Sequence, residues 1–289
     1  MADRIKGSTS LAGLLGYPVK HSKSPKIHNT AFEALNLDNV YLAFEVEDSR
    51  LEEALNALKV LDAIGFSVTM PHKNKVVQLL DEVSEEVKII GSVNTVKNEN
   101  GRLIGYNTDG MGFVKALQEA GVDFEKKKIV IAGAGGAARA IAIQLAFDGA
   151  GEIIMFNRTL STAEKIVSTI NSNIASCRAR AAEMNETVLK EELKDAALLV
   201  NCTSLGMKNA IDKSIVTFPE TLHRVLFVAD IIYDPPKTKL ISIAEEAGCR
   251  TMNGLGMLIW QGAIAFKIWT GRDMPVDLIK KEIGYGLHM

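Results

Sequence analysis

The sequence lacks the features that mark several classes of protein. Its 289 residues carry 33 Lys and Arg against 35 Asp and Glu, a net charge of −2. The chain therefore has no excess of positive charge with which to bind nucleic acid. No apolar run is long enough for a membrane-spanning helix, and the N-terminus has no long apolar core of a signal peptide. We expect a cytoplasmic protein that binds neither nucleic acid nor membranes.

Cysteine and histidine are scarce and scattered. The three cysteines, Cys177, Cys202 and Cys249, lie far apart without a C-x-x-C pair, and the five histidines show no metal-ligand spacing. We expect three separate thiols in a reducing compartment and no metal site. Internal repeats and low-complexity segments are also missing, and the 47% of apolar residues is ordinary for a globular protein.

What the sequence does contain is a strand–turn–helix–strand pattern over residues 128–159. An apolar run at 129–132 leads into a turn that reads Gly133-Ala134-Gly135-Gly136-Ala137, and a second apolar run ends at Asn157-Arg158-Thr159. This order places G-x-G-x-x-A at the first crossover of a βαβ unit. Gly133 permits a tight turn, and Gly135 lets the backbone approach a pyrophosphate. The alternative is a glycine turn that only packs a helix on a sheet.

Strand and helix patterns alternate on both sides of this segment. Before it we expect strands near 11–15, 40–46, 64–69, 92–97 and 102–106. From residue 128 we expect strands near 129–132, 152–156, 176–181, 197–201, 225–230 and 249–252, mostly with helices between them. The length is sufficient for two domains, each with its own core.

Local signals predict how several elements begin and end. Ser24 is expected to cap a helix that starts at Pro25, and Ser49 with Glu52 forms a capping-box pattern for the next helix. A further helix is expected to run through Leu80, and residues 98–101 carry the Asn-Gly chemistry of a tight hairpin. Residues 255–269 are apolar nearly all round, which predicts a deeply packed helix.

Polar side chains gather where expected strands end, which is where ligands of α/β sheets bind. Hydroxyls, amides, one lysine and one carboxylate suit a small, polar, anionic substrate, and they occur at Ser22, Ser24, Thr69, Lys73, Asn94, Asn107 and Asp109. Lys73 with Asp109 would form an acid–base pair, because a carboxylate can orient an ammonium that works on a hydroxyl proton.

Each of these residues also has a plain structural interpretation. Lys73 can be a solvated helix residue, Asp109 a helix cap and Asn94 a partner for hairpin backbone. Tyr233 can be a turn residue beside two prolines. Gln261 is less ordinary, because an amide inside an apolar helix needs hydrogen-bond partners.

Seven motifs, in order along the chain, resemble the shikimate dehydrogenase family and especially its quinate/shikimate branch. The resemblance extends from about Leu14 to Gly271. The motifs are His21-Ser-Lys-Ser-Pro25, Ser67-Val-Thr-Met-Pro-His-Lys73, Gly91-Ser-Val-Asn-Thr95, Gly105-Tyr-Asn-Thr-Asp-Gly110, Gly133-Ala-Gly-Gly-Ala137, Asn157-Arg-Thr159 and Gly254-Leu-Gly-Met-Leu-Ile-Trp-Gln261.

The resemblance implies an N-terminal α/β substrate domain plus a Rossmann-type doubly wound dinucleotide-binding domain, with a cleft between them. The first would comprise residues 1–109 and 256–289, and the second residues 110–255. The implied reaction interconverts 3-dehydroshikimate and shikimate with NADP or NAD, on the route to chorismate and aromatic amino acids. Turnover of quinate and formation of a homodimer both stay open.

The resemblance also implies roles for individual residues. The catalytic pair would be Lys73 and Asp109. The substrate carboxylate would contact Ser22, Ser24 and Tyr233, and the ring hydroxyls would contact Thr69, Asn94, Asp109 and Gln261. The cofactor would contact Gly133, Ala134, Gly135, Gly136 and Ala137 at its pyrophosphate, Asn157, Arg158, Thr159 and Thr162 at its adenosine ribose, and Ile231 and Gly254 at its nicotinamide.

Two alternatives follow from the same residues. No acid stands after the second strand of the βαβ unit, and Arg158 can pair with a 2′-phosphate, which favours NADP. Thr162 stands where the NADP-specific pattern has a second arginine, so NAD use stays open. A non-catalytic dinucleotide-binding regulator of the same fold is the other alternative, but such a protein would be expected to have lost the lysine–aspartate pair or the serine loop.

Overall fold

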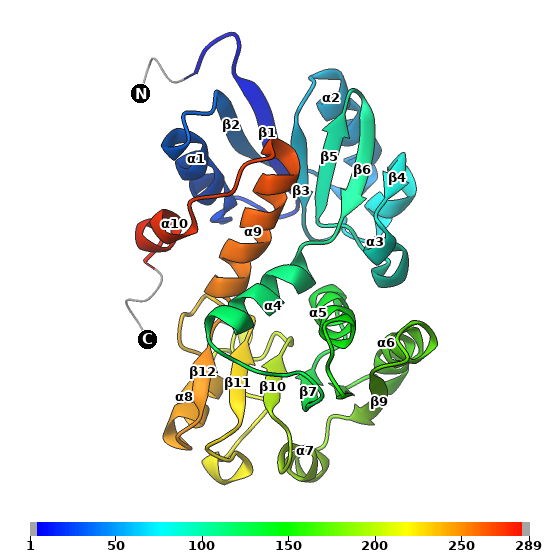
Figure 1. The fold of residues 1–289 in the computed structure, drawn as a ribbon, viewed down its shortest axis with the longest axis vertical. Coiled ribbons are helices and arrows are strands. Elements are labelled where there is room, and N and C mark those ends of the chain that lie inside the picture. Colours follow the sequence, from blue (N-terminus) through cyan, green and yellow to red (C-terminus); the bar gives the residue numbers. More distant parts are fainter. Residues whose placement is uncertain (1–4, 285–289) are drawn as a thin grey trace. The chain divides into compact units, whose positions relative to one another are not determined.

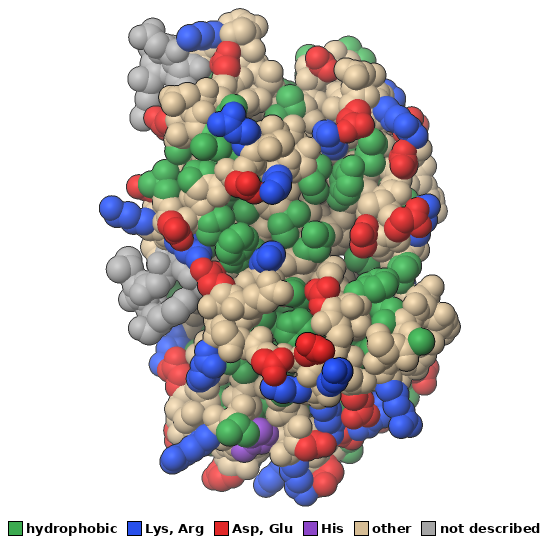
Figure 2. Space-filling model, viewed as in Figure 1, with side chains coloured by type: hydrophobic (Ala, Val, Ile, Leu, Met, Phe, Trp, Pro, Cys, Tyr) green, Lys and Arg blue, Asp and Glu red, His purple; other side chains and the backbone are tan. Residues whose placement is uncertain are grey.

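The computed structural model describes residues 5–284, which divide into two compact units (Figure 1). The first unit comprises residues 5–108 and 259–284, and the second comprises residues 109–258. Each is built on its own six-stranded sheet within these residues. Across the described part of the chain, no helix combines the length and apolar character that crossing a membrane requires. Acidic and basic side chains are interspersed over the face shown in Figure 2.

The sheet of the first unit is mixed and has the strand order β2-β1-β3-β5-β6-β4. Parallel pairs join β1 to β2 and β3 and join β4 to β6, and antiparallel pairs join β3 to β5 and β5 to β6. The strands are β1 (Ser10–Gly16), β2 (Asn39–Glu45), β3 (Gly65–Val68), β4 (Glu82–Val83), β5 (Thr95–Glu99) and β6 (Arg102–Tyr106). The helices are α1 (Ser24–Ala34), α2 (Leu51–Val60), α3 (Glu85–Ile90) and α10 (Val276–Glu282).

The core of the first unit follows from the spacing of apolar residues. In α2, Leu51, Leu55 and Leu58 recur every three or four residues, so they share the face that is buried on the sheet. Phe66 of β3 is fully buried in the same cluster. Their removal from water is the main term that stabilises this unit.

From Ile259 onward, the long apolar helix α9 (Leu255–Thr270) belongs to the first unit, which it completes from the other end of the chain. The indole N–H of Trp269 donates to the carbonyl oxygen of Val96 at 2.9 Å. The indole lies where a side chain on Gly65 would stand, because a Cβ built there would be 2.3 Å from its Cδ1. The prediction of a deeply packed helix is confirmed.

The second unit is a fully parallel sheet with the order β12-β11-β10-β7-β8-β9. The chain winds outward from β7 in one direction and then returns to β10, so the predicted doubly wound sheet is confirmed. The strands are β7 (Lys128–Ala132), β8 (Glu152–Asn157), β9 (Arg178–Glu183), β10 (Leu198–Asn201), β11 (Phe227–Asp230) and β12 (Arg250–Met252). The helices are α4 (Asp109–Glu119), α5 (Gly136–Phe147), α6 (Leu160–Asn173), α7 (Glu186–Leu193) and α8 (Lys239–Glu246).

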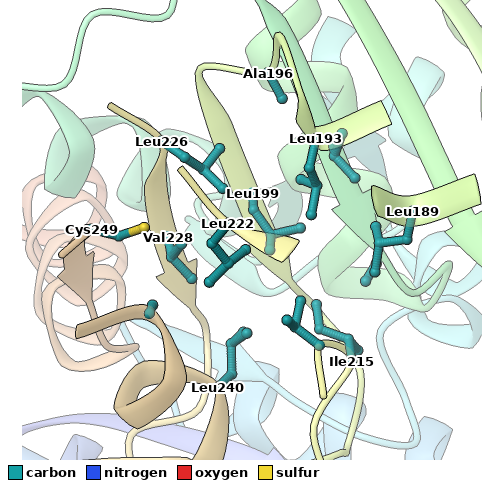
Figure 3. Close-up of a cluster of buried hydrophobic side chains, with 14 of the residues drawn as sticks. Leu189, Leu193, Ala196, Leu199, Ile215, Leu222, Leu226, Val228, Leu240 and Cys249 are labelled. Carbon is teal, nitrogen blue, oxygen red and sulfur yellow. The ribbon is translucent and has the colours of Figure 1, made fainter. Parts of the chain in front are cut away.

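A continuous apolar cluster fills one side of this parallel sheet (Figure 3). Leu199 of β10 and Val228 of β11 meet Leu189 and Leu193 of α7 and Leu240 of α8 in this cluster. The central strands are buried along their whole length, which explains why they read in the sequence as continuous apolar runs.

Local predictions were partly wrong. Ser24 is the first residue of α1 and not its cap, and the expected capping box is replaced by a 3-10 turn at Asp48–Arg50 before α2. Only a 3-10 turn, Lys75–Leu79, forms where a helix was expected to run to Leu80. One cause is that the Lys73 carbonyl accepts from the N–H of Val93 at 2.8 Å and is not available to a helix. The hairpin is confirmed, with positive φ at Asn100 and Gly101.

Candidate functional site

Three of the predicted polar residues in the first unit lie on segments that are hydrogen-bonded to one another. The N–H of Val68, just before Thr69, donates to the Asn94 carbonyl at 2.8 Å, and the N–H of Val93 donates to the Lys73 carbonyl at 2.8 Å. Thr69, Lys73 and Asn94 therefore come together at the end of β3. Gly16 permits this arrangement, because a Cβ there would be 2.3 Å from Thr69 Cγ2.

Asn94 also fixes the segment that leads into α4. Its Oδ1 accepts from the Thr108 N–H at 2.8 Å and its Nδ2 donates to Thr108 Oγ1 at 3.0 Å, and both side chains are buried. Asn107 donates to the Ser92 carbonyl at 3.0 Å. These bonds hold the backbone directly before Asp109, which is the buried first residue of α4. The side chain of Asn94 therefore bonds the backbone of Thr108, just after the hairpin, and not the hairpin backbone that was expected.

A buried tyrosine near the serine loop was not predicted from the sequence. Ser22 Oγ accepts from the Ser24 N–H at 3.2 Å. The phenol of Tyr41 in β2 is fully buried, and burial raises its pKa while the Ser67 and Ser24 hydroxyls partly offset that rise. Tyr41 was missed because the apolar alternation of β2 falls on the neighbouring positions, of which Leu42 is exposed.

A buried aromatic cluster supports this tyrosine. The imidazole of His28 stacks on the Tyr41 ring with 4.4 Å between centroids, and Trp269 lies 5.1 Å from His28. Burial lowers the pKa of His28 to about 3, so the ring is neutral. Gln261 lies half-buried on α9 next to Gly262, where a Cβ would be 3.6 Å from His28 Nε2.

The loop that ends in Lys73 is anchored by its neighbour His72. The imidazole is fully buried, and its Nε2 lies 2.7 Å from the Val46 carbonyl oxygen. Its Nδ1 faces Asp48 Oδ1 at 3.5 Å, and Asp48 also pairs with Lys75 at 2.9 Å. The motif Ser67-Val-Thr-Met-Pro-His-Lys73 was recognised in the sequence, but the anchoring role of this histidine was not.

The glycine turn of the second unit has the geometry of a phosphate-binding turn. Gly133 has a φ of 102°, and a Cβ there would be 2.8 Å from the Cys202 carbonyl oxygen. Gly135 and Gly136, in contrast, have nothing within 4 Å of an added Cβ. Gly135 occupies the cap position of α5 without a side-chain cap, so the first N–H groups of this 12-residue helix can meet an anion.

The adenosine side of the predicted site lies after β8. Asn157 ends the strand, and its Nδ2 donates to the Thr159 carbonyl at 2.9 Å, which fixes the turn. Arg158, within this turn, and Thr162, in the first turn of α6, both have exposed side chains. The turn therefore exposes one guanidinium and carries no acidic side chain of its own.

The remaining predicted cofactor residues lie on the other side of the glycine turn. The Gly254 N–H donates to the Ile232 carbonyl at 3.0 Å, and a Cβ on Gly254 would be only 2.0 Å from the Ile231 carbonyl oxygen. The loops after β11 and β12 therefore touch backbone to backbone here, and Asn253 Nδ2 also donates to the Pro236 carbonyl at 2.9 Å. Tyr233 is half-buried in the first of these loops, and burial raises its pKa.

The structure thus groups the predicted residues in two sets. The first unit holds Ser22, Ser24, Thr69, Lys73, Asn94 and Gln261, and the second holds the nucleotide residues, Tyr233 and, at its first position, Asp109. Within residues 5–284, no group of three or more His, Cys, Asp or Glu side chains could hold a metal ion.

Family models match three parts of the chain. Residues 14–96 match the shikimate dehydrogenase substrate binding domain, residues 115–232 match shikimate / quinate 5-dehydrogenase, and residues 254–283 match the shikimate 5′-dehydrogenase C-terminal domain.

Individual relatives match over nearly the full length. Shikimate dehydrogenase (NADP(+)) of Alkaliphilus metalliredigens is 56% identical, over 98% of this chain and 99% of that protein. The structure of shikimate 5-dehydrogenase from Listeria monocytogenes with shikimate and NAD is similar at a TM-score of 0.94 and 44% identity, over 98% and 99% of the two chains. The structure of shikimate 5-dehydrogenase from Thermus thermophilus with NADP(H) and shikimate is also similar. Its TM-score is 0.84 and its identity 33%, over 94% of this chain and 97% of that chain.

Proposed function

Because the chain belongs to the shikimate dehydrogenase family, we propose that it catalyses the reversible, NAD(P)-dependent reduction of 3-dehydroshikimate to shikimate. The observation that carries the proposal is the group of segments around Thr69, Lys73 and Asn94, joined by backbone hydrogen bonds at the end of β3. A second unit with a phosphate-binding turn supports it. In a reducing cytoplasm, this reaction would serve the synthesis of chorismate and aromatic amino acids.

The chemical step moves a hydride and a proton. In the oxidation of shikimate, the hydride leaves C3 for the nicotinamide and the proton leaves the C3 oxygen. Lys73 and Asp109 take up this proton as a pair, and in the reverse direction they return it to the ketone oxygen. Half-burial of Lys73 and burial of Asp109 favour strong interaction with a small substrate, because solvent screens such groups less.

The substrate carboxylate is bound by neutral hydroxyl groups rather than by an arginine. The Ser22 and Ser24 hydroxyls and the Tyr233 phenol bind the carboxylate, and the ring hydroxyls meet Thr69, Asn94, Asp109 and Gln261. Shikimate carries one carboxylate and three hydroxyls, so this donor and acceptor set complements it. The hydrogen bond from the Ser24 N–H to Ser22 Oγ supports this assignment, because it orders the serine loop without a bound ligand.

The nucleotide binds at the carboxyl edge of the second sheet. The turn from Gly133 to Ala137 takes the pyrophosphate, and the open sides of Gly135 and Gly136 leave room for it. Asn157, Thr159 and Thr162 meet the adenosine ribose, with Arg158 placed to pair with a 2′-phosphate. Ile231 and Gly254 line the nicotinamide. Bound there, the nicotinamide supplies the hydride acceptor or donor.

The test is a set of steady-state assays that combine shikimate or quinate with NADP or NAD and follow absorbance of the reduced nicotinamide. We expect Lys73→Ala to lower turnover roughly 100-fold or more while circular dichroism and melting temperature stay near wild type. Lys88→Ala is the control, because Lys88 pairs with Glu85 on the surface. Near-normal turnover of the Lys73 variant, or no turnover of shikimate by the wild type, would contradict the proposal.

A further inference from the structure

The second unit contains a buried carboxylate that the proposed reaction does not yet use. Asp230 is the last residue of β11 and is 1% exposed. It lies at the carboxyl edge of the sheet, directly before the loop that carries Ile231 and Tyr233. A buried carboxylate without a cation beside it is costly, so its hydrogen-bond partners decide whether it can be tolerated.

All the groups that the structure places on Asp230 are hydrogen-bond donors. Its Oδ1 accepts from the Ile232 N–H at 3.1 Å and from Asn201 Nδ2 at 3.1 Å, and its Oδ2 accepts from Thr238 Oγ1 at 2.7 Å. Burial raises the pKa of Asp230, and these three donors oppose that rise. These three donors fit an ionised carboxylate, because its oxygens can only accept hydrogen bonds.

The direction of each bond is fixed by neighbouring backbone. Asn201 Oδ1 accepts from the Thr203 N–H at 3.0 Å, so its amide nitrogen must face Asp230. Thr238 Oγ1 accepts from the Ile241 N–H at 3.3 Å as the cap of α8, so its own hydrogen is free to donate to Asp230. An amide in place of the carboxylate has only one acceptor oxygen, so at least one of these three donors would lose its acceptor.

Through these bonds, Asp230 joins the loops that follow β10 and β11. Asn201 is the last residue of β10 and also donates to the Leu205 carbonyl in the loop that follows, at 3.2 Å, while Ile232 and Thr238 belong to the loop after β11. The Ile232 carbonyl in turn accepts from Gly254, so the loop after β12 is attached as well. A single carboxylate thereby orders three consecutive loops on one edge of the sheet.

Topology tells which part of a dinucleotide these loops meet. The chain reverses direction between β7 and β10, and a ligand lies across the carboxyl ends at such a switch point. The pyrophosphate site follows β7, and the adenosine lies toward β8. The other half of the molecule must then extend over β10 and β11, toward the loops that Asp230 holds.

We propose that Asp230 is a positioning residue, which orders the wall of three loops against which the nicotinamide half of the cofactor and, through Tyr233, the substrate are held. The inference rests on the proposed function for its kinetic consequences. Its binding consequences can be measured without substrate.

The first test compares whole and partial nucleotides on Asp230→Asn, which keeps the size of the side chain. We expect the dissociation constant for NADP or NAD and the KM for shikimate to rise, and kcat/KM to fall roughly 10- to 100-fold. Binding of 2′,5′-ADP and ADP, which lack the nicotinamide, should change by less than about twofold. A general loss of folding would weaken both kinds of ligand equally.

The second test alters the partner. Thr238→Val keeps the shape of the side chain but removes the hydroxyl, and Thr238→Ser keeps the hydroxyl. We expect the serine variant to resemble wild type and the valine variant to repeat the kinetic defect of Asp230→Asn. Equal behaviour of both Thr238 variants, wild-type kinetics of Asp230→Asn, or equal loss of fragment and dinucleotide binding would overturn the inference. If the wild type is inactive but Asp230→Asn still weakens dinucleotide binding and spares fragment binding, then only the proposed reaction is contradicted.

Discussion

Glu192 allows a quantitative prediction about the stability of the second unit. Its carboxylate is 14% exposed at the end of α7, where it pairs with Arg180 of β9 and, at 2.9 Å, with Lys128 of β7. The Arg180 guanidinium, followed by Lys128, lowers the pKa of Glu192 from 4.5 to about 2. These residues lie toward the amino ends of the strands, opposite the edge that is proposed to bind the nucleotide.

The size of the effect follows from this pKa. A shift of one pKa unit corresponds to about 1.4 kcal/mol, so a fall from 4.5 to about 2 sets an upper bound of roughly 3 kcal/mol. Arg180 is 39% exposed, and solvent screens that partner. We therefore expect Glu192→Gln to lower the free energy of unfolding by about 1–2 kcal/mol at pH 7.

The pH dependence has a definite sign. Because the pKa of Glu192 is lower in the folded protein, its stabilising contribution is complete above the unfolded pKa of 4.5 and is lost as pH falls toward about 2. Urea unfolding of wild type and Glu192→Gln should differ at pH 7, and the difference should be clearly smaller at about pH 3 and vanish only near about pH 2. Added salt should also reduce the difference. A difference that is absent at pH 7, or equally large at both pH values, would refute this reasoning.

Two further predictions concern the proposed sites. Arg158→Ala should raise the KM for NADP roughly tenfold while the KM for NAD changes little, since only NADP has a 2′-phosphate. Parallel titrations of the two nucleotides measure both KM values, and equal changes in them would exclude a contact between Arg158 and the phosphate. His72→Phe should lower kcat several-fold at nearly constant shikimate KM, because the bond from Nε2 to the Val46 carbonyl would be lost, whereas His72→Gln can retain a donor there. Equal kcat values for the two His72 variants would contradict an anchoring role.

The second unit was the more predictable part of the fold, for a physical reason. Its four central strands β7, β8, β10 and β11 are buried on both faces, so each appears in the sequence as an apolar run, and the glycine turn marks the first crossover. The first unit has less distinct signals. The two-residue strand β4 has no periodicity to detect, and the expected helix to Leu80 fails partly because Lys73 bonds to Val93, a distant partner.

The candidate site was predictable where it consists of contiguous motifs and unpredictable where it depends on distant partners. Lys73 and Gly133 stand in recognisable local patterns. The role of Asp230 depends on Asn201, 29 residues earlier, and on Thr238, eight residues later. Tyr41 became a candidate only when folding placed its phenol beside two serine hydroxyls.

Asp230 and Glu192 show why burial alone does not reveal the role of a carboxylate. Cations lower the pKa of Glu192, so its charge stabilises the fold. Burial raises the pKa of Asp230, so its charge destabilises the fold, and the neutral hydrogen-bond donors offset only part of this cost. Replacement of Glu192 by Gln should therefore reduce stability and spare turnover. Replacement of Asp230 by Asn should reduce turnover out of proportion to stability. A costly buried charge at a ligand-binding edge has an explanation if the loops that it orders contact the ligand. The opposite responses of the Glu192 and Asp230 variants would distinguish this positioning role from a purely structural one.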